Sequence, residues 1–216
     1  MQYTTILWDL DGTLLDTLSD LTAGVNYALA AHGFSAVTCE QVRKAVGHGV
    51  RNLICSLLPD GAQTPAFDAV YADFRAHYSA NYNVYTKPYP GIPELLQELK
   101  SKGAAMAVVS NKPDEFVKAL VKAHFGDLFS AALGDREGIP RKPFPDGCEE
   151  ALRLLGKGKE HAVYIGDSET DIATAKNAGL PLLCVSWGFR EEETLQLAGA
   201  QDIFPDVQAL HACLLD

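Results

Sequence analysis

The 216-residue sequence lacks any pair of cysteines at the short spacing that is typical of a zinc site. Its five cysteines are odd in number and lie far apart, at Cys39, Cys55, Cys148, Cys184 and Cys213. This distribution argues against structural zinc and indicates a reducing compartment. We therefore expect a cytoplasmic protein in which most of the cysteines are small buried apolar residues.

Long apolar runs and an excess of positive charge are also missing. No stretch is long enough to span a membrane, and the N-terminus has no basic segment before its short apolar run, so we expect neither a membrane span nor a signal peptide. The net charge of −10 disfavours nonspecific binding to nucleic acid or to anionic membranes. A few local cations would still suffice to hold a small anionic substrate. Repeats and low-complexity segments are absent as well.

From about residue 90 onward, the sequence alternates short apolar runs with amphipathic helical patterns. The candidate strands are 104–109, 129–133, 162–165 and 182–185, and the candidate helices are 91–102, 113–124, 145–155 and 169–178. Strands that are apolar throughout indicate a parallel sheet covered on both faces. We therefore predict an α/β core with a Rossmann-like, doubly wound parallel sheet. Right-handed crossovers would place all strand carboxyl ends at one edge, where such proteins have their sites.

Residues 16–85 have a different pattern with almost no β-type run. Apolar residues at helical spacing predict four helices there, around 18–29, 42–46, 50–58 and 67–78. We predict that this block is an α-helical cap domain, inserted into an α/β core formed by 1–15 and 86–216. The alternative is a separate helical domain.

The most informative segment is the short apolar, β-prone stretch that ends in Asp9-Leu10-Asp11-Gly12-Thr13. On an extended strand, Asp9 and Asp11 point to the same side. Two such carboxylates repel and need a proton or a cation, and Mg²⁺ suits hard oxygen ligands. A metal-bound Asp9 could then attack phosphorus. The alternative is a strand that ends in an ordinary Asp-Gly turn.

Three later segments bring polar side chains to predicted strand ends or loops. The Ser110 hydroxyl and the Asn111 amide can bind phosphate oxygens or cap the following helix. Lys142 lies in a proline-rich loop and either offsets charge in a site or is solvated. Asp167 and Asp171 share one face at a helix start, where acidic residues also complement the helix dipole. Delivery of all these groups to one sheet edge favours a single site.

The order of these motifs resembles the haloacid dehalogenase-like superfamily, whose phosphohydrolases use an aspartate nucleophile. The motifs are Asp-x-Asp-Gly-Thr, then Ser-Asn, then Lys-Pro, then Gly-Asp-x-x-x-Asp, and all four are matched. The match is close to the phosphatase branch, because the dehalogenases that name the superfamily lack the residue that corresponds to Asp11. The helical block resembles the cap that follows the first motif in one subgroup.

The resemblance implies a role for each motif residue. Asp9 would attack phosphorus and form an aspartyl-phosphate, while Asp11 would protonate the leaving oxygen and then activate water. Lys142 would neutralise charge near Asp9. The phosphoryl oxygens would be bound by Ser110, by Asn111 and by the backbone after Asp11, at Gly12 and Thr13.

Mg²⁺ is the cofactor that the resemblance implies. Asp9, the backbone carbonyl of Asp11, and Asp167 would hold the ion, and Asp171 would orient a metal-bound water or Lys142. In the helical block, Arg51 is the candidate for binding a distal anionic group such as a carboxylate. The alternative places Arg51 on a solvated helix face.

The expected substrate is a small phosphate ester, with 2-phosphoglycolate as the best guess. Residues 9–17, 46–53 and 110–113 are similar to the corresponding segments of phosphoglycolate phosphatases. A sugar-phosphate mutase of the β-phosphoglucomutase type and a pyrophosphatase remain alternatives. A phosphonoacetaldehyde hydrolase would need a cap lysine that forms a Schiff base, and Lys44 is available. A phosphoacceptor signalling module is the alternative from a different class.

Overall fold

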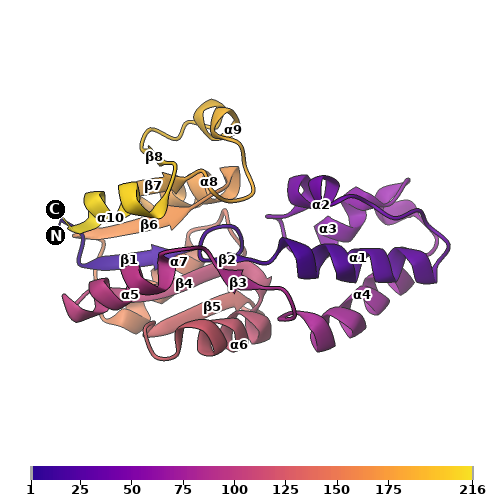
Figure 1. Ribbon diagram of the computed structural model, residues 1–216, viewed down its shortest axis with the longest axis horizontal. Helices are drawn as coiled ribbons and strands as arrows, with labels where there is room; N and C mark the ends of the chain where they lie inside the picture. Colours follow the sequence, from indigo (N-terminus) through magenta and orange to yellow (C-terminus); the bar gives the residue numbers. More distant parts are fainter. Residues whose placement is uncertain (1, 216) are drawn as a thin grey trace. The chain divides into compact units, whose positions relative to one another are not determined.

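A computed structural model describes residues 2–215 and divides the chain into two compact units. One unit comprises the chain up to Leu15 and from Pro88 onward, and the other comprises Asp16–Lys87. Figure 1 shows the first unit as mixed strands and helices and the second as helices. None of the described helices is both long and apolar enough to cross a bilayer.

The first unit is built on a parallel sheet with the strand order β5-β4-β1-β6-β7-β8. Its strands are β1 (Thr5–Trp8), β4 (Ala105–Pro113), β5 (Ala131–Asp135), β6 (Ala162–Gly166), β7 (Leu182–Val185) and β8 (Ile203–Phe204). β1 lies in the middle, where Ile6 is in register with Met106 on one side and Val163 on the other. The prediction of an α/β core with a doubly wound parallel sheet is therefore confirmed. The two-residue β8 is too short to give a pattern.

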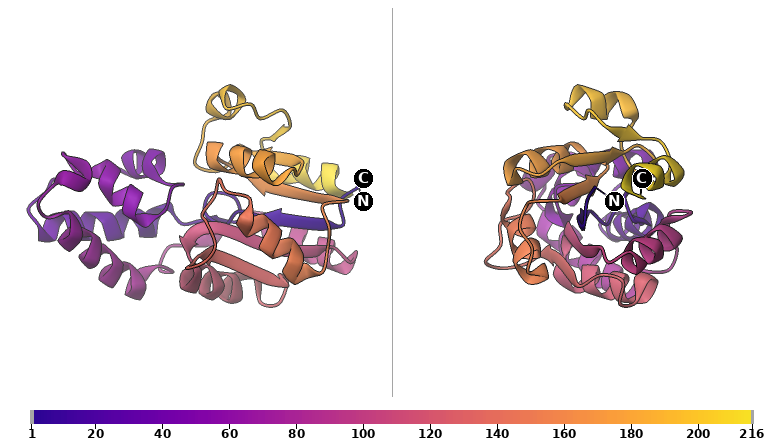
Figure 2. Two further views of the ribbon diagram at one scale, coloured as in Figure 1. Left: turned by 180° about the vertical axis from the view of Figure 1, so that it is seen from behind. Right: turned by 90° about the vertical axis from the view of Figure 1, so that its left-hand side faces the viewer.

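Helices cover both faces of this sheet, as Figure 2 shows. They are α5 (Ile92–Ser101), α6 (Asp114–Phe125), α7 (Asp146–Leu155), α8 (Glu169–Ala178) and α10 (Val207–Leu215), whereas α9 (Glu192–Leu197) lies beyond the β8 end of the sheet. α5 packs against α10, whereas α7 packs against α8 on the opposite face. Apolar side chains of β1, β4 and β6 fill the space under α7 and α8, and all four residues of β1 are buried. The central strands are thus held rigidly from both sides.

The cysteines only partly match expectation. Cys148 and Cys184 are buried, but Cys55 and Cys213 are partly exposed and Cys39 is exposed. The prediction that most of them are buried is therefore wrong. Cys39 is the first residue of a surface helix, where its side chain meets solvent.

The strand β4 runs further than the sequence predicts. It continues through Ser110, Asn111 and Lys112 to Pro113, with a shift in its register against β5 after Val109. Helix α6 begins at Asp114, and the residue that precedes it supplies no side-chain cap. The alternative in which Ser110 or Asn111 caps this helix is therefore wrong, because the irregular pairing keeps the chain extended.

The second unit contains the four helices that the apolar spacing predicts. They are α1 (Leu18–Ala31), α2 (Cys39–Ala45), α3 (Val50–Leu57) and α4 (Phe67–Asn81), with a short 3₁₀ turn η1 (Gly61–Gln63) before α4. α1 packs along α4, and the buried side chains of Val25, Leu29, Val70 and Phe74 lie on these two helices. Thr38 and Gln41 form a reciprocal capping box that fixes the start of α2.

A buried carboxylate connects the beginning and the end of the helical unit. Asp20, in the first turn of α1, accepts backbone N–H bonds from Val84, Tyr85 and Thr86 at 2.9–3.1 Å. It also accepts a hydrogen bond from the Thr86 hydroxyl at 2.7 Å. This bonding holds residues 84–86 to α1, and the helical unit extends to Lys87, two residues beyond the predicted 85.

The chain passes between the units through a two-stranded sheet of β2 (Leu15–Asp16) and β3 (Lys87–Pro88). The two passages of the chain therefore run side by side. A long insertion needs closely spaced ends of this kind if it is to leave the sheet undisturbed.

We expect Asp20→Asn to lower the free energy of unfolding by about 2–3 kcal/mol, because an amide cannot accept all of these hydrogen bonds and leaves buried donors unpaired. Urea denaturation followed by circular dichroism measures this change. Asp60→Asn, at a surface position without a side-chain cap bond, is the matched control. Equal stability of the two variants would contradict this role of Asp20.

Candidate active site

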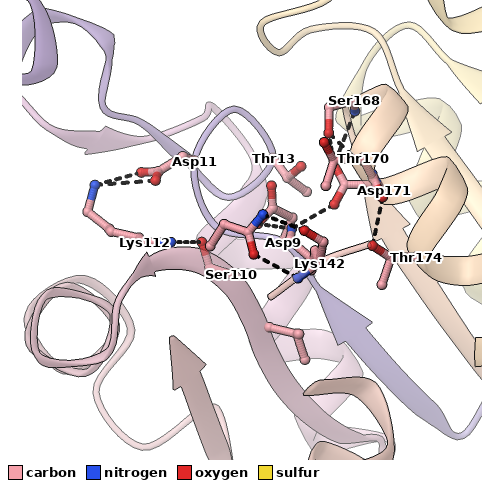
Figure 3. Close-up of polar contacts among 12 residues, drawn as sticks. Asp9, Asp11, Thr13, Ser110, Lys112, Lys142, Ser168, Thr170, Asp171 and Thr174 are labelled. Carbon is pink, nitrogen blue, oxygen red and sulfur yellow. Dashed lines mark hydrogen bonds and ion pairs between the residues drawn. The ribbon is translucent and has the colours of Figure 1, made fainter. Parts of the chain in front are cut away.

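Asp9 follows directly after β1, at the carboxyl edge of the sheet. Its backbone N–H donates to the carbonyl of Ile165 at 2.9 Å, which extends the pairing of β1 with β6 by one residue. The side chain is only 10% exposed. Its Oδ1 lies 2.8 Å from Nζ of Lys142. The central strand therefore holds this carboxylate in a mostly buried position, and Figure 3 shows its contact with Lys142.

Lys142 lies between two carboxylates. Besides Asp9, its Nζ contacts Oδ1 of Asp171 at 2.7 Å and donates to the hydroxyl of Tyr164 at 3.1 Å. The backbone of Lys142 is held in turn by Asn111, whose amide accepts from the Lys142 N–H at 2.9 Å and donates to its carbonyl at 3.0 Å. A flexible side chain is thus anchored at both ends, which aims its charge at Asp9.

Asp167 follows β6 and has defined partners for both of its oxygens. Oδ1 accepts a hydrogen bond from the Thr13 hydroxyl at 2.7 Å, and Oδ2 accepts from the backbone N–H of Phe189 at 2.8 Å. A side chain at Gly12 or at Gly188 would collide with this carboxylate. Gly12 also has a φ of +88°, which favours glycine. Both glycines therefore keep space open beside Asp167.

Asp171 is a structural residue as well as a charged one. With Ser168 it forms a capping box at the start of α8, in which Oδ2 accepts the N–H and the hydroxyl of Ser168. Oδ1 accepts from Lys142 and from the hydroxyl of Tyr164. The sequence suggested either an acidic helix start or a site residue; the structure shows the helix start, with the same carboxylate at Lys142, and the site role stays a prediction.

Burial among like charges shifts the acidity of these groups. Burial first, and then the charge of Asp171, raise the pKa of Asp9 well above its usual value despite the nearby Lys142. The same two causes raise the pKa of Asp167 to about 7. Burial alone would lower the pKa of Lys142, but the charges of Asp171 and Asp9 outweigh it and hold that pKa above its ordinary value. Lys142 therefore stays protonated, and the carboxylates need more positive charge.

The donor set fits a magnesium ion. Carboxylate oxygens of Asp9, Asp167 and Asp171 all lie within 4.8 Å of one another. Among the described residues, none donates a well-directed hydrogen bond to the buried Oδ1 of Asp9, although Lys142 lies at ion-pair distance. Hard oxygen ligands, raised carboxyl pKa values and the space beside Gly12 match what Mg²⁺ requires.

The remaining predicted residues of the core lie close by. Ser110 is buried in β4, and its Oγ accepts from the backbone N–H of Lys112 at 3.3 Å. Asn111 is bonded to the backbone of Lys142, a role that the sequence gives no sign of. Thr13 is fully buried and directs its hydroxyl at Asp167. That these residues bind phosphate stays a prediction.

Asp11 and Arg51 form ion pairs with residues outside the cluster around Asp9. The carboxylate of Asp11 forms an ion pair with Lys112, at 3.0 Å from Nζ. Arg51 belongs to the helical unit, where it pairs with Asp68 at 3.1 Å and lies over the ring of Phe67 at 4.6 Å.

Two residues that contact Lys142 or Asp171 were not predicted from the sequence. They are Tyr164 and Ser168, which have the pattern of an ordinary strand residue and an ordinary helix-start residue.

Comparison with known proteins identifies the class. The model of the haloacid dehalogenase-like hydrolase family matches residues 6–185. The chain therefore belongs to this family, and it is an enzyme of the phosphatase kind.

Within this class, the sequence is similar to several enzymes that share one name. It is 38% identical over 191 residues to a phosphoglycolate phosphatase of Rhodobacter capsulatus, with 86% of this chain and 85% of the relative covered. It is also 38% identical over 186 residues to a phosphoglycolate phosphatase of Aquifex aeolicus, with 85% of each covered. The chain thus resembles phosphoglycolate phosphatases over most of its length.

Solved structures agree with this placement. A crystal structure of a protein from Lactobacillus delbrueckii subsp. bulgaricus superposes with a TM-score of 0.95 at 35% identity, covering 100% of this chain and 99% of that one. CbbY from Rhodobacter sphaeroides, solved in complex with phosphate, superposes with a TM-score of 0.76 at 28% identity, covering 94% and 93%. The fold is therefore one that binds phosphate in a relative.

We expect Mg²⁺ to raise the melting temperature more at about pH 8 than at about pH 6, because the ion must displace the proton that Asp167 carries below its pKa of about 7. The sign follows from linkage: in the metal-free protein, ionisation of this buried carboxyl costs stability as the pH rises through that value, and the ion offsets the cost. Thermal unfolding with and without Mg²⁺ measures the effect. An equal increment at both pH values would contradict the assignment, and Asp167→Asn should remove the increment.

Proposed function

We propose that this protein is a Mg²⁺-dependent phosphomonoesterase that works through an aspartyl-phosphate and hydrolyses 2-phosphoglycolate. The observation that carries the proposal is the position of Asp9, a buried carboxylate at the end of the central strand, next to Lys142 and close to Asp167 and Asp171. The similarity to phosphoglycolate phosphatases supports the choice of substrate.

The first half-reaction transfers the phosphoryl group to the enzyme. An oxygen of Asp9 attacks phosphorus, and the bond from phosphorus to the ester oxygen breaks. Asp11 gives its proton to that leaving oxygen, so glycolate departs as an alcohol. Lys142 offsets the negative charge that Asp9 and the phosphoryl group bring together, and its ammonium already lies 2.8 Å from Asp9.

The second half-reaction releases phosphate. Water attacks the phosphorus of the aspartyl-phosphate, Asp11 takes the proton of that water, and the bond to Asp9 breaks to restore the carboxylate. The ion, held by Asp9, the backbone carbonyl of Asp11 and Asp167, would supply positive charge for the phosphoryl oxygens. Ser110 donates from the neighbouring strand, and the backbone at Thr13 provides a further donor, since the N–H of Gly12 donates to the carbonyl of Leu15 at 2.9 Å.

Water must be kept away from the phosphoryl group until the leaving group has departed. A helical unit inserted straight after the nucleophile segment suits this task. Arg51 is the candidate residue of that unit for contact with the anionic substrate. Its ion pair with Asp68 is exposed and therefore weak, so the substrate can replace this partner.

Asp9→Asn should abolish phosphate release from 2-phosphoglycolate in Mg²⁺ buffer, because an amide cannot form the aspartyl-phosphate. The measurement is release of inorganic phosphate, and chelation of Mg²⁺ should stop it as well. Asp127→Asn, at an exposed position, is the control and should leave the rate unchanged. Isomerisation that needs added bisphosphate, without net release, would show a mutase instead. Full activity of Asp9→Asn would refute the mechanism.

Ser110→Ala should lower kcat roughly 10²-fold, the usual effect of losing one donor to a transition-state oxygen. Steady-state kinetics with the same substrate gives this number. Ser101→Ala, which removes an exposed hydroxyl from the end of α5, serves as the control. A KM effect alone would place Ser110 in substrate binding rather than in transition-state stabilisation.

A further inference from the structure

Lys112 is a buried cation that the proposed mechanism does not use. It lies at the end of β4, and its side chain is only 2% exposed. Nζ is 3.0 Å from Oδ1 of Asp11 and 3.3 Å from Oδ2, so the ammonium faces both carboxylate oxygens. Figure 3 shows the Asp11 carboxylate turned toward Lys112 and away from Asp9. An ion pair thus holds the proposed acid and base outside the reaction.

This arrangement conflicts with the work of Asp11. The leaving oxygen is attached to the phosphorus that Asp9 attacks, so Asp11 has to leave Lys112, take up a proton from water and turn toward Asp9 before it can protonate that oxygen. That movement would break the ion pair of a buried ammonium, and removing one partner from a buried pair is strongly unfavourable. A second anion that takes the place of Asp11 beside Lys112 would offset the free-energy cost of this movement.

We propose that Lys112 is a specificity-determining residue that binds the carboxylate of the substrate and thereby releases Asp11. The inference rests on the proposed function and adds to it a residue for recognition. In 2-phosphoglycolate, a single carbon separates the carboxylate from the ester oxygen, so the carboxylate arrives where Asp11 has to act. One carboxylate replaces another at the ammonium, and the number of buried ion pairs is conserved.

The exchange makes recognition and catalysis the same event. An ester without a carboxylate can place its phosphoryl group at Asp9, but it offers Lys112 no replacement for Asp11. Asp11 then stays in its ion pair, and proton transfer to the leaving oxygen is slow. Such a substrate loses kcat as well as affinity, which is the pattern of binding energy used in the transition state.

The test compares 2-phosphoglycolate with glycolamide phosphate, which has nearly the same shape and a neutral amide in place of the carboxylate. In the wild-type enzyme, kcat for 2-phosphoglycolate should be higher by on the order of 10–10²-fold. In Lys112→Gln the ratio of the two kcat values should collapse to within about threefold, whereas Lys112→Arg, which keeps the charge, should retain most of it. Lys122→Gln removes an exposed, ion-paired lysine from α6 and should keep the wild-type ratio.

Binding gives a readout that does not depend on turnover. In an Asp9→Asn background with Mg²⁺, isothermal titration should show that Lys112→Gln weakens 2-phosphoglycolate much more than glycolamide phosphate. The comparison of the two esters in the wild-type enzyme needs no substitution at Lys112, so it decides the matter even where a variant fails to fold.

Several outcomes overturn the inference and leave the proposed function intact. They are equal kcat values for the two esters in the wild type, an equal loss on both esters in Lys112→Gln, and collapse of the ratio in Arg51→Gln but not in Lys112→Gln. Failure of the wild-type enzyme to release phosphate from either ester with Mg²⁺ overturns the proposed function instead, and the inference with it.

Discussion

The candidate active site depends on a single ammonium group buried between carboxylates. Lys142 touches Asp9 and Asp171 at 2.8 and 2.7 Å, and without its charge the sheet edge would bury several like charges within a few ångströms of one another. Other features serve this contact: Asn111 fixes the backbone of Lys142, and Tyr164 positions its Nζ. Burial, and after it the charge of Asp171, raise the pKa values of Asp9 and Asp167 in spite of this ammonium. A divalent cation would offset the negative charge that remains in the cluster.

A second buried ammonium, that of Lys112 at the end of β4, is also paired with a carboxylate. Lys112 and Asn111 are neighbours on this strand, yet one reaches Asp11 and the other holds the loop of Lys142. The irregular end of β4, where the register against β5 shifts, keeps the backbone extended through these residues instead of letting it turn into α6. The irregular pairing at the end of β4 therefore lets Asn111 hold Lys142 beside Asp9 while Lys112 pairs with Asp11.

Much of the architecture could be predicted from the sequence, because apolar periodicity reports burial directly. The four helices of the inserted unit and the strands β4, β6 and β7 follow from it, as does the delivery of Asp9 and Asp167 to one edge. The short strand β8 and the short helices α9 and α10 were not predicted, because so few residues give too weak a periodic pattern. Contacts that depend on the direction of a side chain were not predictable either. The pairing of Asp11 with Lys112 spans 101 positions, and that of Asp20 with Thr86 spans 66. Nothing local in the sequence marks either pair.

The paired strands β2 and β3 have an evolutionary consequence. Since the two ends of the inserted segment leave the sheet next to each other, the segment behaves as a closed loop, and the entropy cost of such a loop grows only slowly with its length. The tie from Asp20 to residues 84–86 lies wholly inside that loop. A segment of different length or composition can therefore be exchanged at this point while the strands next to Asp9 and Lys112 keep their geometry. The inserted segment and the sheet are encoded in separable stretches of the gene, and each can drift under its own selection.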